Sequence, residues 1–170
     1  MTLVQSLWFL PFALPIAIWV SWSDMKFMKI PNTAVIALMA VWLVVGLGLV
    51  WFQEMPIKTW AWGWALLAIV MVIGFIANMI SLIGAGDAKF AAAMAPFFVV
   101  ADVRYALGLF AACMLAAFFI HRIARRIPAL KSLTTTWVSW TNKDFPMGLA
   151  LSATLLFYLA TPVWQYLRAG

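Results

Sequence analysis

Residues 33–52 read TAVIALMAVWLVVGLGLVWF, a run of hydrophobic and small residues without a charge. At about 1.5 Å of rise per residue, a helix of this length spans the hydrocarbon core of a bilayer, which is about 30 Å thick. The composition agrees, because 67% of the 170 residues are hydrophobic and 9% are charged, whereas soluble domains average roughly 45–50% and about 25%. The stretch therefore predicts a membrane-spanning helix in an all-α integral membrane protein.

Further apolar segments lie on both sides of this helix, and no linker or internal repeat separates them. The chain is therefore predicted to form a single polytopic domain over residues 1–170, embedded in a lipid bilayer. Segment 89–102 is short for a crossing, so a re-entrant or interfacial helix is the alternative there. Snorkelling of Lys89 and Arg104 at its ends would extend its reach. About six spans are predicted, over residues 5–23, 33–52, 60–83, 89–102, 104–121 and 146–166.

The basic residues indicate the orientation. An excess of lysine and arginine marks the cytoplasmic loops of membrane proteins. With the N-terminus outside and six crossings, three of the eleven basic residues lie outside, and the inner loops hold Lys26, Lys29, Lys89, Arg122, Arg125, Arg126, Lys131 and Lys143. Because these residues form short clusters between apolar runs, they indicate membrane topology, and no nucleic-acid partner is expected.

Asp24 and Asp87 are two of only five acidic residues, and each lies where an apolar segment meets a polar one. The predicted topology places both at the cytoplasmic face. Two neighbouring carboxylates do not both ionise cheaply, so one keeps a proton while the other acts as a base that activates water. Such acid–base chemistry requires no metal or cofactor, and none is predicted. The single cysteine, Cys113, provides neither a disulfide nor a cysteine metal cluster.

The two aspartates also have structural interpretations. Asp87 could form an ion pair with Lys89 or with a basic loop, and Asp24 could be a solvated loop carboxylate. In the tetrapeptide GAGD, residues 84–87, Gly84 and Gly86 let a substrate backbone approach and permit dihedral angles that other residues avoid. The alternative is that these glycines are a helix-packing surface.

Five other residues have open roles beside the aspartates. Pro31 and Asn32 are expected to stop the turn and cap the following span, and the turn also fixes Asp24 in an alternative interpretation. Lys89 is either an interfacial anchor or tunes the aspartate pair. Pro146 and Gly148 begin the last span, where they form either an ordinary helix start or a notch that admits substrate.

Three blocks of sequence occur at the predicted ends of the spans, namely DMKFMKIPN at residues 24–32, GAGDAKF at residues 84–90 and FPMGLA at residues 145–150. Together they resemble the signature blocks of the bacterial type IV prepilin peptidases. In that family one aspartate precedes an Ile-Pro-Asn turn, a second ends a Gly-x-Gly-Asp sequence followed by lysine, and a Pro-x-Gly block opens the last span. The blocks occur here in the same order and cover nearly the whole chain. Ala85 departs from the glycine of many relatives.

The resemblance implies an aspartic endopeptidase of the bacterial inner membrane with a periplasmic N-terminus and Asp24 and Asp87 as the catalytic pair. Its partner would be a single-span prepilin, cut at the cytoplasmic face after the glycine that ends its basic leader. The chain begins directly at a span and lacks a four-cysteine zinc region. It is therefore similar to the short peptidases of Flp/Tad pilus systems, and methyltransferase activity is not expected. Two alternatives are a small transporter that relays ions through the aspartates and a non-catalytic pilus assembly subunit.

Overall fold

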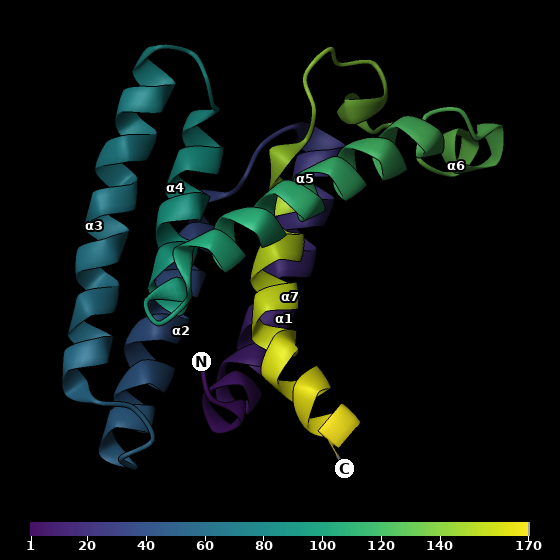
Figure 1. Ribbon diagram of the computed structural model, residues 1–170. Coiled ribbons are helices and arrows are strands. Elements are labelled where there is room, and N and C mark those ends of the chain that lie inside the picture. The colour runs from purple at the N-terminus through teal and green to yellow at the C-terminus, as the bar shows by residue number, and fades with distance from the viewer. Residues whose placement is uncertain (170) are drawn as a thin grey trace.

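The computed structural model describes residues 1–169, and over this range the chain contains helices and connecting turns but no strand, which confirms the all-α prediction (Figure 1). Seven α-helices and two short 3₁₀ helices follow one another along residues 1–169. They are α1 (Leu3–Phe27), α2 (Asn32–Trp51), α3 (Ile57–Met79), α4 (Ala85–Met94), η1 (Ala95–Phe98), α5 (Val103–Ala124), α6 (Pro128–Leu133), η2 (Val138–Trp140) and α7 (Met147–Ala169).

Within residues 1–169, five helices are long and apolar enough to cross a membrane, namely α1, α2, α3, α5 and α7. The chain is therefore a multi-pass membrane protein. The segment predicted at 89–102 is not among the five. It forms α4, which has ten residues, and η1, which has four, and both are too short to be counted as spans. Pro96 lacks the backbone N–H that would continue the α-helical hydrogen bonds, which explains why α4 ends at Met94. A sixth crossing and the orientation in the membrane stay predictions.

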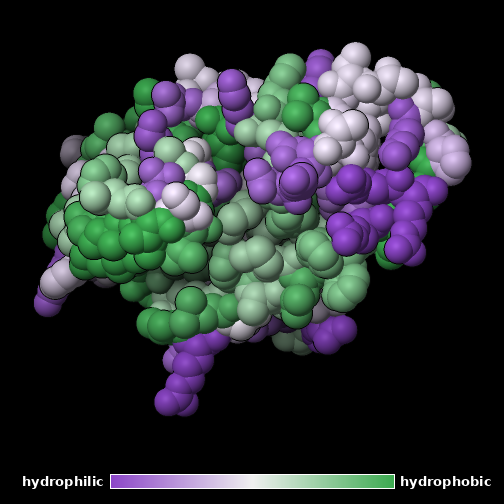
Figure 2. All heavy atoms as spheres, turned by 90° about the horizontal axis from the view of Figure 1, so that it is seen from above, coloured by the Kyte–Doolittle hydropathy of each residue, from purple (hydrophilic) through white to green (hydrophobic). Residues whose placement is uncertain are grey.

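The helices alternate in direction between two ends of the molecule (Figure 1). α1 rises to the upper end of the figure, α2 descends, α3 rises and α4 returns beside it. α5 then rises with a strong tilt, and α7 descends to the end where the N-terminus lies. The turns α1–α2 and α3–α4, together with the segment between α5 and α7, therefore gather at the upper end. Figure 2, seen from above, shows hydrophilic side chains across this end and hydrophobic ones on its flanks.

The short helix α4 is largely covered by other helices, which explains why it needs no greater length. It packs against α2, α3 and α7, and its residues Phe90, Ala92 and Ala93 are fully buried. After it, Phe97 lies edge-on to both Phe9 of α1 and Trp42 of α2, with ring centroids 5.0 and 5.3 Å away. All three aromatic side chains are fully buried. The centre of the core therefore lies along α4 and η1.

The turn between α1 and α2 differs from the prediction in detail. α1 continues to Phe27, four residues beyond the predicted end of the span, so Asp24 lies inside the helix and not in a loop. Met28 adopts a left-handed conformation with φ 53°, and the Ser23 hydroxyl donates a hydrogen bond to the Lys29 carbonyl oxygen over 2.8 Å. Pro31 occupies the N-cap position of α2, where no side chain caps the helix. The Pro31–Asn32 pair therefore ends the turn at the start of α2, but it provides no side-chain cap.

Candidate functional site

A cavity of about 1000 Å³ contains both aspartates at the upper end of the molecule. Its walls come from the end of α1, the turn between α3 and α4, the middle of α5 and the segment that leads into α7. Segments far apart in the sequence thus meet around one space. The lining residues are Asp24, Met28, Asn78, Ser81, Leu82, Ile83, Gly84, Asp87, Met114, Phe118, Asn142, Asp144, Phe145 and Met147.

Asp24 lies in the last turn of α1 and is held by the start of α7. The backbone N–H of Gly148 donates a hydrogen bond to Oδ2 of Asp24 over 2.7 Å. This N–H belongs to the first turn of α7, where backbone donors have no partner within the helix. A Cβ atom at Gly148 would lie 2.9–3.1 Å from Oδ2, Cβ and Cγ of Asp24, which is closer than ordinary packing. The space beside Asp24 therefore favours glycine at this position.

Asp87 lies in the first turn of α4 and is partly buried. Burial raises the pKa of the Asp87 carboxyl above its ordinary value of 3.8, and a hydrogen bond from the backbone of Gly84 opposes this shift. Gly84 is the N-cap residue of α4, and a Cβ atom there would lie 2.7 Å from Oδ2 of Asp87. The first glycine of the GAGD sequence thus leaves room for the carboxylate.

The two carboxylates line the same cavity. Lys89 follows Asp87 in the sequence, but its Nζ atom donates to Oδ1 of Asn32 over 3.3 Å. This contact joins α4 to the start of α2 and directs the lysine toward a neutral amide. The arrangement favours a carboxylate pair over an ion pair between Asp87 and Lys89.

The remaining predicted residues support the site from outside the cavity. Gly86 packs against the turn before α2, where its Cβ would lie 3.4 Å from Cβ of Ile30. Pro146 is fully buried directly before α7, so it does not form an open notch. The expectation that the glycines supply unusual dihedral angles is wrong, because no glycine among residues 1–169 has a positive φ. At Gly84, Gly86 and Gly148 the absence of a side chain provides space.

Two notable lining residues, Asp144 and Asn78, were not predicted from the sequence. Asp144 adds a third carboxylate to the cavity, and it stands directly before the block at residues 145–150. The amide of Asn78 donates to the Ile83 carbonyl oxygen over 2.8 Å, which fixes the turn that leads to Gly84. Counting the few acidic residues at this end of the chain would have identified Asp144. Nothing in the sequence distinguishes Asn78 from an ordinary helix-end residue.

Asp87→Asn is expected to raise the melting temperature of the chain in detergent at neutral pH. The pKa of Asp87 is raised in the folded protein. The contribution of this carboxyl to the stability of the fold is therefore fully present below pH 3.8 and is lost as the pH rises through the raised pKa. Asparagine is neutral at every pH and avoids this loss. Thermal unfolding measured across this pH range should show a gain that grows with pH.

The matched control is Glu54→Gln, which removes an exposed carboxylate from the turn between α2 and α3. Its melting temperature should follow that of the wild type at every pH. If the melting temperature of Asp87→Asn rises equally at every pH, or falls at neutral pH, the raised pKa of Asp87 does not explain the change.

Comparison with known proteins identifies a family. Residues 11–121, well over half of the chain, match the type IV leader peptidase family. The matched range includes Asp24, Asp87 and helices α2, α3 and α4 in full. No curated protein and no solved structure matches the chain.

Proposed function

The chain belongs to the type IV leader peptidase family, and from this premise we propose that it is an aspartic endopeptidase that uses Asp24 and Asp87 to remove the leader from a prepilin. The observation that supports this most directly is the single cavity that both carboxylates line. A position at one end of the helices also differs from that of a relay through the membrane centre, which would place carboxylates near the midplane on discontinuous helices.

The proposed reaction is general acid–base hydrolysis of a peptide bond. One ionised carboxylate accepts a proton from water, and the water oxygen bonds to the carbonyl carbon of the scissile peptide. The protonated partner hydrogen-bonds the carbonyl oxygen as negative charge develops there. A proton then passes to the leaving nitrogen, the carbon–nitrogen bond breaks, and the pair again shares one proton.

The geometry supports a defined place for each carboxylate in this scheme. Gly148 fixes one oxygen of Asp24, so the carboxylate is oriented before substrate arrives. Asp87 lies on a different helix, and burial raises its pKa, which favours retention of a proton closer to neutral pH. The pair therefore combines an oriented carboxylate on α1 with a partly buried carboxyl on α4.

The substrate proposed is a Flp-type prepilin, cut after the glycine that ends its basic leader. The resemblance of the three sequence blocks supports this class, with cleavage at the cytoplasmic face of the inner membrane. The cavity adds a chemical reason, because it holds three carboxylates, of Asp24, Asp87 and Asp144, and would attract a basic segment.

The test is cleavage by the wild-type chain in membranes that contain a Flp-type prepilin. Leader loss is followed on gels, and the mass of the product identifies its new N-terminus. The expected product begins directly after the leader glycine, and substitution of that glycine in the precursor should block its formation. If several Flp-type prepilins remain uncut in membranes that hold the folded chain, the peptidase proposal fails and a non-catalytic assembly role gains support.

A further inference from the structure

A second cavity of about 420 Å³ lies below the aspartates, between α3 and α5. We call it the α3–α5 groove. Helix α4 and η1 form its floor, α3 and α5 form its two walls, and its lining is almost wholly apolar. The lining residues are Leu66, Val70, Ile73, Gly74, Ala77, Ile83, Ala88, Ala91, Met94, Ala95, Phe98, Ala106, Leu107, Phe110, Leu151 and Thr154.

The α3–α5 groove continues from the aspartate cavity. Ile83 lines both spaces, and the floor residue Ala88 directly follows Asp87. Ala91 and Ala95 are four and eight residues after Asp87, so the carboxylate and the two alanines lie along one face of this helical segment. A segment lying on these alanines would therefore lead straight to Asp87.

The walls of the groove face outward. Ile73 of α3 and Leu107 of α5 are 60% and 63% exposed. Only Gly63 and Gly74 of α3 are buried, and α5 tilts away from α3 toward the upper end (Figure 1). The groove is thus accessible from the side, at the depth of the membrane-spanning helices.

The floor explains why the occupant would be a helix. Within a bilayer, hydrophobicity alone does not drive helices together, and close packing on small residues does. Ala88, Ala91 and Ala95 are such small residues along the bottom of the groove, where Ala91 is half-buried and Ala88 and Ala95 are buried. Larger side chains on an incoming helix would fit over them.

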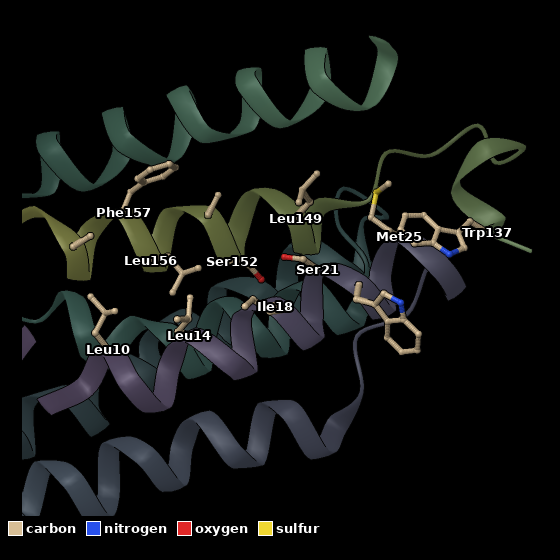
Figure 3. Close-up of a pocket in the computed structure, with 13 residues that line it drawn as sticks. Leu10, Leu14, Ile18, Ser21, Met25, Trp137, Leu149, Ser152, Leu156 and Phe157 are labelled. Carbon is tan, nitrogen blue, oxygen red and sulfur yellow. The ribbon is translucent and has the colours of Figure 1, made fainter. Parts of the chain in front are cut away.

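A larger apolar groove, between α1 and α7, is lined by Met25, which directly follows Asp24, but it does not open into the aspartate cavity through a common lining residue. It has a volume of about 690 Å³ and contains Leu10, Leu14 and Leu156 (Figure 3). Apolar character and size therefore do not single out the α3–α5 groove, whereas its continuity with the reaction site does.

We propose that the α3–α5 groove binds the apolar helical segment that follows the scissile bond of the prepilin. This inference rests on the proposed function, which supplies a substrate with a polar leader on one side of the cut and a single apolar span on the other. The leader would occupy the aspartate cavity while the span lies on α4. The scissile bond would then stand at the junction of the two spaces, beside Asp87.

The test is disulfide cross-linking in membranes between the chain and a Flp-type prepilin. Cys113→Ala removes the only native cysteine, and Asp24→Asn keeps the substrate uncut. Single cysteines then replace Ile73 or Leu107, and the prepilin carries one cysteine in its apolar segment, shortly after the cleavage site. Cross-linking at both groove positions should exceed that at the matched control positions several-fold.

The controls are Val72→Cys and Leu115→Cys. Both side chains are 59% exposed, on α3 and α5 respectively, and neither lines the groove. Equal cross-linking at groove and control positions would overturn the inference and leave lipid as the occupant. Cleavage of the same prepilin by the wild-type chain is measured in parallel. The peptidase proposal and the groove proposal are therefore tested by different results. Groove-selective cross-linking without wild-type cleavage would support the groove and overturn the peptidase.

Discussion

Asp24→Asn and Asp87→Asn are each expected to reduce prepilin cleavage by about 10⁴-fold, the upper range for loss of a positioned acid or base. Asparagine matches aspartate in size but neither accepts a proton from water nor holds one to donate. Both carboxylates line the same cavity, so removal of either member ends the sharing of a proton. Initial rates of leader removal by purified variants would measure the effect.

The fold of both variants should persist, because the substitutions preserve shape. Glu54→Gln, at the opposite end of the molecule, should retain the wild-type rate. Melting temperatures in detergent would show that a lost rate is not lost folding. If either asparagine variant cleaves at the wild-type rate, that aspartate is not part of the catalytic pair.

Gly148→Ala is expected to reduce cleavage by about 10²-fold, since a misplacement of about 1 Å at a reacting group has this cost. The added Cβ would lie 2.9 Å from Oδ2 of Asp24 and 3.0 Å from its Cβ. Either the carboxylate or the start of α7 must then move, and the hydrogen bond from the Gly148 N–H is disturbed. Cleavage rates, together with melting temperatures, would test this expectation.

Gly108→Ala provides a matched control within another long helix. A Cβ atom at Gly108 meets no other atom within 4 Å, so this variant should cleave at the wild-type rate. Combining Gly148→Ala with Asp24→Asn should give no further loss beyond that of Asp24→Asn alone, because both changes act on the same carboxylate. Additive losses would show that Gly148 acts elsewhere.

The membrane class and the long helices were predictable because they depend on local composition. Uncharged runs of about 20 residues identify spans without any knowledge of tertiary contacts. Helix α4 was harder to predict, because a short segment of small residues lacks the long uncharged run that identifies a span. Its start at Ala85 and its end at Met94 depend on the turn after α3, on Pro96 and on burial by three other helices.

The candidate site was likewise predictable only where local sequence determines it. Asp24 and Asp87 stood out because acidic residues are rare in the chain, and the family blocks placed both in the correct order. The contact between Asp24 and Gly148 joins residues 124 positions apart, a pairing that no local pattern encodes. The roles of Asn32 and Lys89 were also inaccessible, because their side chains meet only when α2 and α4 are placed side by side.

The first turns of two helices converge on the aspartate pair. Gly148 is in the first turn of α7 and donates to Asp24, while Asp87 is in the first turn of α4. Each helix N-terminus carries a partial charge equivalent to about +0.5 of an elementary charge. Two such ends together balance about one negative charge, which is the total charge of two carboxyl groups that share one proton. The peptide dipoles of these two helices thus suit the half-protonated pair that the proposed mechanism requires.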